Sequence, residues 1–123
     1  MRYFRDPFPL SVVQVLELGA GTGLAGSAAA SLGAAHVLLT DLAYTLGNLR
    51  ATVARLPLAS PLRAPDVALL DWNDPTSLPP PTPAWDVVLA ADCIWLDHLV
   101  PVMITIPAST VVLVVLFVLF VYM

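Results

Sequence analysis

The chain has 123 residues, which is enough for one domain with a substantial core and too few for two. Hydrophobic residues make up 59% of it and charged residues only 11%, so either most of the chain is buried in a sheet or part of it lies in a membrane. A net charge of −4, with five Lys and Arg residues, argues against a nucleic-acid partner. The single cysteine, Cys93, excludes an internal disulfide and fits a reducing compartment, so we expect a cytoplasmic protein.

Short apolar runs alternate with helix-like stretches along the chain, which is the pattern of a parallel sheet flanked by helices. The first predicted strand is 12–18, and a glycine-rich turn follows it. An Ala-rich helix is then predicted over 24–32, ended by Gly33 at the position where a left-handed cap is common. A second strand over 36–40 leads directly into Asp41.

The second half of the chain continues the alternation. An amphipathic helix with apolar residues at spacings of three and four ends before Pro57, and a third strand follows over 66–70. The stretch 73–83 contains five prolines and is predicted to be an exposed loop without a structural element. A fourth strand over 86–91 and a short helix over 96–105 complete the predicted core.

The C-terminal stretch allows two interpretations. Residues 104–123 carry no charge and are just long enough for a membrane span, which needs about 20 apolar residues. The first part of the stretch equally fits a buried fifth strand. We therefore predict an N-terminal lead-in over 1–11, a core over 12–105 and an apolar tail over 106–123, and both interpretations of the tail stay open.

The strongest functional signal is the sequence ELGAGTGLAG, residues 17–26, between the first strand and the following helix. Glycines at this point let the backbone turn sharply and approach a ligand, and the amides of the helix N-terminus face that ligand. The spacing of Gly21, Gly23 and Gly26 also matches the dinucleotide fingerprint, with Asp41 where its ribose-binding acid lies. The glycines and Asp41 therefore leave two classes of cofactor open.

Glu17 separates these two classes. A carboxylate two residues before Gly19 would repel the pyrophosphate of a dinucleotide, but it suits a cofactor with an amino group and a sulfonium. The sequence therefore favours S-adenosylmethionine. One cysteine and two distant histidines form no metal-ligand cluster, so no metal is expected.

Residues 15–91 resemble the class I, or seven-β-strand, methyltransferases. The closest resemblance is to the family of protein-lysine methyltransferases and nicotinamide N-methyltransferase-like proteins. The segments that carry it are VLELGAGTGLAG, HVLLTDL, NLR, LLDW and WDVVLAADCIW, in this order. The resemblance implies an α/β fold with a Rossmann-like parallel sheet and flanking helices, of which this chain would hold about four to five of the seven strands.

The resemblance also implies a cofactor site at the carboxyl ends of the strands, built from Glu17, Gly19, Gly21, Gly23, Asp41, Asp71, Trp72 and Ala91. In this site the glycines and Glu17 would hold the methionine end of S-adenosylmethionine. Asp41 would accept hydrogen bonds from the ribose hydroxyls, and Asp71 with Trp72 would border the adenine. Ala91 would lie beside the cofactor.

Asp92 and Trp95 occupy an acid-x-x-aromatic motif that such enzymes place near the methyl acceptor, where Tyr is the common aromatic. The implied acceptor is a protein lysine, whose amine must lose its proton from a reference pKa of about 10.4 before it attacks. Asp92 would orient that amine. The structural alternatives are a strand-end cap for Asp92 and a packing residue for Trp95.

Only eleven residues precede the first predicted strand, and the resemblance fades after about Met103. We therefore expect a truncated methyltransferase that acts on a protein lysine. Its cofactor site would be nearly complete, but the truncation can make it inactive. Two alternatives remain. One is a fragment of an NAD-binding oxidoreductase, and the other is a non-catalytic relic anchored to a membrane through residues 104–123.

Overall fold

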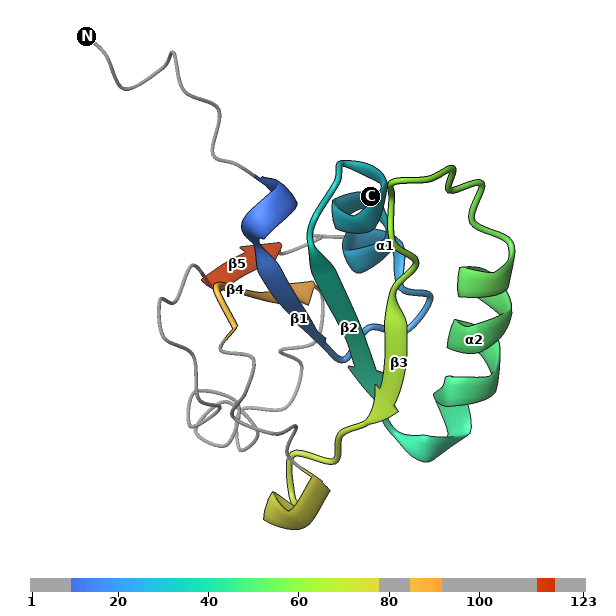
Figure 1. Cartoon of the computed structure of the whole chain (residues 1–123). Helices are drawn as coiled ribbons and strands as arrows, with labels where there is room; N and C mark the ends of the chain where they lie inside the picture. The colour runs from blue at the N-terminus through green and yellow to red at the C-terminus, as the bar shows by residue number, and fades with distance from the viewer. Residues whose placement is uncertain (1–9, 78–84, 92–112, 117–123) are drawn as a thin grey trace, which may run out of the picture.

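The computed structural model describes residues 10–77, 85–91 and 113–116. They form a parallel sheet of five strands in the order β3-β2-β1-β4-β5, with two α-helices packed on it (Figure 1). The strands are β1 (Gln14–Leu18), β2 (His36–Asp41), β3 (Asp66–Leu69), β4 (Val87–Ala91) and β5 (Leu113–Leu116). The helices are α1 (Leu24–Ser31) and α2 (Leu46–Ala54), and the 3-10 helices are η1 (Leu10–Val12), η2 (Ala43–Thr45) and η3 (Pro75–Ser77). The predicted α/β fold with a Rossmann-like parallel sheet is confirmed.

The strand order reverses between β1 and β4. The chain passes from β1 through α1 to β2 and through α2 to β3, and β4 then pairs with the opposite side of β1. Leu16 of β1 accordingly lies between Leu38 of β2 and Val88 of β4. Open α/β sheets bind their ligands outside the carboxyl ends of the strands at such a reversal.

Side chains on the two faces of the sheet form separate cores, because successive residues of a strand point to opposite faces. On one face, Val15 and Leu39 pack with Ala30 of α1 and Leu49 of α2, and all four side chains are buried. On the other face, Leu16, Leu18 and Val88 pack with Leu70 and Trp85. Glu17 alternates with Leu16 and Leu18, so it points to the face that the helices cover.

The element boundaries differ from the sequence prediction by a few residues, and each difference has a local cause. Val12 lies in η1 and is 67% exposed, because pairing of β1 begins only at Gln14 opposite His36. The second helix ends at Ala54, and the N–H groups of Arg55 and Leu56 then donate to carbonyls three residues back. Gly33, predicted to end the first helix, has a positive φ of 101°.

One prediction about the loop after the third strand is wrong. Within 73–83 the described residues contain a single turn of 3-10 helix, η3, where no element was expected. The carboxylate of Asp74 accepts hydrogen bonds from the N–H and the hydroxyl of Thr76 at 3.0 and 2.6 Å, and these bonds fix the turn. A short polar side chain that bonds to the backbone two residues on favours such turns.

Four residues of the apolar tail form β5, which runs parallel to β4 from Leu113 opposite Val88 to Leu116 opposite Ala91. The predicted helix 96–105 and the remaining residues of the tail lie outside the described residues. In the described parts of the chain, no helix has the length and apolar character needed to cross a membrane.

Candidate functional site

The loop that joins β1 to α1 has a backbone that only glycine adopts easily. Gly19, Gly21 and Gly23 have φ angles of 57°, 57° and 75°. At Gly21 no atom lies within 4 Å of the position of an added Cβ, so the backbone conformation alone requires glycine there. At Gly23 an added Cβ would also lie 3.0 Å from both Leu39 and Leu49. The loop is therefore a tight turn whose exposed side lies at the carboxyl end of β1.

Gly26 allows α1 to approach the sheet closely. A Cβ at this position would overlap the side chain of Leu39 and would lie 2.5 Å from Oε2 of Glu17. Because the Cβ is absent, the N–H of Gly26 donates a hydrogen bond of 2.9 Å to Oε2 of Glu17. The first strand and the first helix are thus joined through the Glu17 carboxyl group.

Glu17 is buried to a degree that is unusual for a carboxylate, with 2% of its surface exposed. Burial removes water from the carboxyl group and raises its pKa from 4.5 to about 7. The hydrogen bond from Gly26 acts in the opposite direction, and the negative charge of Asp41 adds to the increase in pKa. Glu17 therefore exchanges a proton near neutral pH.

Asp41 connects the end of β2 to the glycine loop. Its Oδ2 accepts a hydrogen bond of 2.7 Å from the N–H of Gly21, and its Oδ1 accepts one of 2.7 Å from the N–H of Leu42. A carboxylate offers about four lone-pair sites, so each oxygen retains capacity for one further donor. Asp41 is half-buried and keeps that capacity at the rim of the sheet.

Thr40 is a site-forming residue that the sequence analysis did not identify. Its hydroxyl donates a buried hydrogen bond of 2.6 Å to the backbone carbonyl of Glu17. Its own carbonyl accepts a hydrogen bond of 2.9 Å from the N–H of Ala20 in the glycine loop. One indication of this role was present in the sequence, which is that a hydroxyl residue stands near the end of an apolar strand, directly before Asp41.

Asp71 and Trp72 follow β3, next to the end of β2. The N–H of Leu70 donates to the carbonyl of Asp41 at 3.0 Å, so the two strand ends stay adjacent. Oδ1 of Asp71 accepts a hydrogen bond of 2.9 Å from the N–H of Asn73, which fixes the turn that follows. Trp72 is partly buried and packs against the apolar core on the face away from the helices.

The structure thus brings most of the predicted site residues to one edge of the sheet. Ala91 ends β4 at the same edge, although its side chain lies outside the described residues. Asp92 and Trp95 lie outside the described residues altogether. Among the residues described, no group of three or more His, Cys, Asp and Glu side chains is placed to hold a metal ion.

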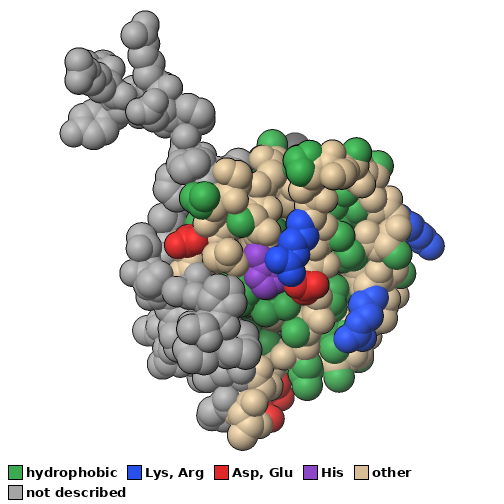
Figure 2. Space-filling view, viewed as in Figure 1, with side chains coloured by type: hydrophobic (Ala, Val, Ile, Leu, Met, Phe, Trp, Pro, Cys, Tyr) green, Lys and Arg blue, Asp and Glu red, His purple; other side chains and the backbone are tan. Residues whose placement is uncertain are grey.

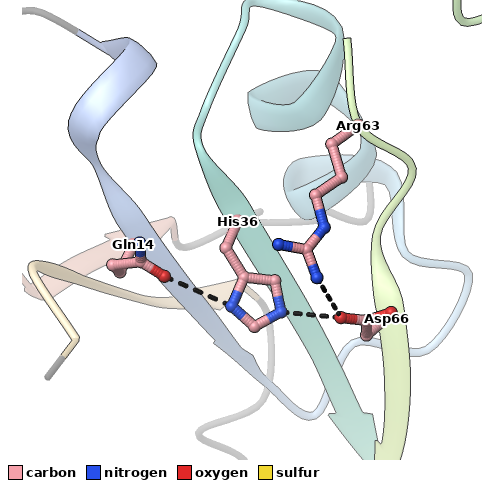
Figure 3. A network of polar contacts seen from close by, with 4 residues as sticks. All are labelled: Gln14, His36, Arg63 and Asp66. Carbon is pink, nitrogen blue, oxygen red and sulfur yellow. Dashed lines mark hydrogen bonds and ion pairs between the residues drawn. The ribbon is translucent and has the colours of Figure 1, made fainter. Parts of the chain in front are cut away.

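A second polar cluster lies at the opposite, amino-terminal edge of the sheet (Figure 3). His36 begins β2, and its ring nitrogens lie 3.2 Å from Oε1 of Gln14 and 2.7 Å from Oδ2 of Asp66. Arg63 also donates to Asp66, at 3.2 Å. Figure 2 shows the histidine at the surface beside a basic and an acidic side chain, among largely uncharged atoms. This cluster joins the starts of β1, β2 and β3 and is separate from the glycine loop.

Comparison with known proteins gives a consistent result. A model of the lysine methyltransferase family matches residues 6–114. The chain is 39% identical over 83 residues to protein-lysine methyltransferase METTL21E of Bos taurus, and these residues are 66% of this chain and 28% of that protein. It is 37% identical over 92 residues to EEF1A lysine methyltransferase 3 of Xenopus tropicalis, covering 74% of this chain and 38% of that protein. The chain therefore spans about a third of the length of these relatives.

A solved structure shows the same fold. Magnesium protoporphyrin IX methyltransferase from Synechocystis, with bound SAH, superposes with a TM-score of 0.66 over 87% of this chain and 47% of that one. At 20% identity this likeness concerns the fold alone. Together with the strand order and the glycine loop, it defines the fold of a class I methyltransferase.

Because the family model covers most of the sequence, the chain belongs to the lysine methyltransferase family. These comparisons do not support the alternative of an NAD-binding oxidoreductase.

Proposed function

We propose that this chain binds S-adenosylmethionine and belongs to an enzyme that methylates lysine side chains of proteins. The observation that carries the proposal is the pair of carboxyl groups at the connection from β1 to α1, where the strand order reverses: Asp41 binds Gly21 of the glycine loop, and Glu17 binds Gly26 of α1. Membership in the family and the names of the two relatives support lysine as the acceptor.

The residues present fit this cofactor. The loop at Gly21 has open space where a side chain would stand, so a ligand can approach the backbone there. Two acidic groups without a basic partner in the described residues suit a cationic ligand better than a pyrophosphate. Asp41 retains acceptor capacity for ribose hydroxyls, and each charge-assisted bond contributes roughly 1.5–3 kcal/mol.

We assign the remaining positions to the same cofactor. The glycines 19, 21 and 23 would hold the methionine end together with Glu17, and Asp71 with Trp72 would border the adenine through polar and apolar contacts. Ala91 would line the site at the end of β4. When bound, S-adenosylmethionine supplies an electrophilic methyl group on a positively charged sulfur.

The contribution of the protein is mainly positioning. Asp92 would orient the acceptor amine and Trp95 would enclose it, so that the amine approaches the methyl group in line. Removal of water from the acceptor site favours the neutral amine that carries the reaction. The proposed location is cytoplasmic, which fits the single cysteine of the chain. The proposed division of the chain is a lead-in over 1–11, the cofactor-binding core over 12–105 and the apolar tail over 106–123.

Calorimetric titration of the purified chain tests the cofactor. We expect saturable binding of S-adenosylmethionine and of its demethylated product, and no binding of NADH. Asp41→Ala should abolish the binding, whereas Asp66→Ala, the same change at the opposite edge of the sheet, should preserve it. Binding of NADH, or equal binding by both variants, would contradict the proposal.

Transfer to lysine is tested separately. The chain is incubated with a cofactor that carries a labelled methyl group and with a mixture of purified proteins, and the products are analysed for methylated lysine. Label on lysine supports the acceptor class, and label confined to another residue type would contradict it.

A further inference from the structure

The connection from α2 to β3 presents a short exposed segment at the amino-terminal edge of the sheet (Figure 1). Residues 59–64 are all exposed and carry the sequence Ala-Ser-Pro-Leu-Arg-Ala. The N–H of Leu62 donates a hydrogen bond of 3.0 Å to the carbonyl of Ala59, so Ser60 and Pro61 occupy the two central positions of a turn. Ser60 therefore lies in a surface turn, where a modifying enzyme can reach its hydroxyl.

The residues that follow Ser60 are those that one class of kinase recognises. Proline stands directly after the serine, and Arg63 stands three positions after it. Proline has no backbone N–H, so a kinase whose pocket offers no acceptor at this position favours proline there. The guanidinium of Arg63 adds a charge that an anionic group of the kinase can bind with two hydrogen bonds. The segment therefore fits a proline-directed serine kinase that prefers a basic residue at the third position after the serine.

We propose that Ser60 accepts a phosphoryl group from such a kinase, and that Arg63 then leaves Asp66 and binds the phosphate. In the transfer, Oγ of Ser60 forms a bond to the γ-phosphorus of ATP, and the bond from this phosphorus to the β–γ bridging oxygen breaks. ADP leaves with the electron pair, and the hydroxyl proton passes to a carboxylate base of the kinase. The inference goes beyond the proposed function and does not depend on it, because the segment lies at the edge of the sheet opposite the glycine loop.

Arg63 is held loosely enough to change partners. Its side chain is 57% exposed and lies 3.2 Å from Oδ2 of Asp66, whose side chain is 55% exposed (Figure 3). Exposed ion pairs of this kind contribute little to stability. A phosphate on serine carries about −1.5 to −2 charges at neutral pH and three acceptor oxygens, so it binds a guanidinium more strongly than one carboxylate does.

Asp66 keeps a partner in this exchange. Its Oδ2 also lies 2.7 Å from Nε2 of His36, whose other ring nitrogen lies 3.2 Å from Oε1 of Gln14. The ring of His36 packs against Trp85 with 5.5 Å between the ring centroids, so its position does not depend on Arg63. The starts of the strands therefore stay joined, and movement of one exposed side chain accommodates the phosphate.

The chain contains an internal control for the role of Arg63. Thr82 is the other serine or threonine that proline follows, but Trp85 stands three positions after it in place of a basic residue. Thr82 lies outside the described residues. A kinase that recognises proline alone would modify both positions, whereas a kinase that also recognises the basic residue would prefer Ser60.

Incubation of the purified chain with a cyclin-dependent kinase and ATP, followed by mass mapping of peptides, tests the proposal. We expect phosphate on Ser60 and incorporation at Thr82 that is slower by about tenfold or more, the value of one charge-assisted hydrogen bond. Ser60→Ala should abolish the main product, and Ser60→Thr should retain it. Arg63→Ala should lower kcat/KM at Ser60 by about tenfold or more. Arg50→Ala removes the same charge from an exposed position of α2 and should leave kcat/KM unchanged.

A synthetic peptide of residues 55–68 separates recognition of the sequence from its presentation by the folded protein. We expect the kinase to modify both the peptide and the chain. Modification of the peptide but not of the folded chain would overturn the inference, because Ser60 would then be inaccessible in the protein. Failure of both substrates, faster reaction at Thr82, or equal rates for Arg63→Ala and Arg50→Ala would overturn it as well.

Phosphorus NMR of the modified chain tests the binding of the phosphate by Arg63. A nearby guanidinium favours the doubly ionised phosphate, so the second pKa of the phosphoserine should be lower in the natural chain than in phosphorylated Arg63→Ala. Phosphorylated Arg50→Ala should match the natural chain. Equal pKa values in the natural chain and in Arg63→Ala would show that Arg63 does not exchange Asp66 for the phosphate.

Discussion

The carboxylate of Asp41 accepts a hydrogen bond from the N–H of Gly21, 20 residues earlier in the chain, at 2.7 Å. The same carboxylate bonds to the N–H of Leu42, so one side chain fixes both the glycine loop and the turn after β2. The loop is therefore held in shape by a residue that also has spare acceptor capacity for a ligand.

The variant Asp41→Asn should lower the free energy of unfolding by about 1–2 kcal/mol, because asparagine has one acceptor oxygen for the two N–H donors that Asp41 binds, and its NH₂ group would face the second N–H. Urea denaturation measures the change. Asp66→Asn, at an exposed position on the opposite edge, serves as the control and should differ from the natural chain by less than about 0.5 kcal/mol. Equal effects of the two variants would contradict the role of Asp41 in holding the loop.

Gly26→Ala should lower the free energy of unfolding by about 1–3 kcal/mol, because the added methyl group overlaps Leu39 and crowds Oε2 of Glu17. Gly47→Ala is the matched control, since Gly47 lies in α2 with no atom within 4 Å of the added Cβ. The control should stabilise the protein by up to about 1 kcal/mol through helix propensity. Thermal and urea denaturation of both variants test the pair, and a neutral Gly26→Ala would refute the close contact.

Gly21→Ala and Gly23→Ala separate backbone strain from crowding. Both positions have a positive φ, which costs a side-chain-bearing residue about 1–2 kcal/mol. Gly23→Ala should cost more, because its Cβ also meets Leu39 and Leu49 at 3.0 Å. Gly21→Asn should recover part of the stability, as asparagine tolerates this conformation better than alanine. Urea denaturation of the three variants should therefore give the lowest unfolding free energy for Gly23→Ala, a higher one for Gly21→Ala and the highest for Gly21→Asn. Equal values for the two alanine variants would contradict the crowding at Gly23.

The stability of the chain should depend on pH through Glu17. Burial raises the pKa of Glu17 from 4.5 to about 7, so the folded state binds the proton more tightly than the unfolded state. The resulting stabilisation is fully present below about pH 4.5 and is lost as the pH rises through about 7, a loss of about 3 kcal/mol. Glu17→Gln lacks this loss, and its unfolding free energy should therefore exceed that of the natural chain increasingly between about pH 5 and about pH 8. Parallel pH profiles of the two proteins would exclude the linkage.

The polar cluster at the amino-terminal edge should matter little for the site. Arg63 and Asp66 are both more than half exposed, and exposed ion pairs contribute about 0–1 kcal/mol. Arg63→Ala should thus change the unfolding free energy by less than about 0.5 kcal/mol and leave the affinity for S-adenosylmethionine unchanged. A loss of affinity in this variant would show that the two edges of the sheet are coupled.

The sequence predicted the order of the elements well because the strands read as short apolar runs, and the central strand β1 is buried on both faces. The glycine loop was equally predictable, because its glycines stand where the backbone needs a positive φ. The carboxyl group of Glu17 marked the same segment by its charge. The roles assigned to the site residues remain predictions. Thr40 was missed because a single hydroxyl in a strand gives no sign of its hydrogen-bond partner.

The remaining differences depend on tertiary contacts. The apolar character of Val12 suggests a strand, but only the register of Gln14 with His36 determines where β1 begins. The long apolar run that contains β5 has no period that distinguishes a buried strand from a membrane helix. Its pairing with β4 became visible only in the assembled sheet.

The position of β1 between β2 and β4 has a consequence for how the chain folds. The N–H of Gln14 bonds to Asp86, 72 residues later, whereas β2 follows β1 after a single short helix. During synthesis the unit β1–α1–β2 emerges complete while the other edge of β1 still lacks its neighbour. Local contacts form quickly and distant ones slowly, so we expect that open edge to be the most aggregation-prone surface of the nascent chain and a natural target for chaperones.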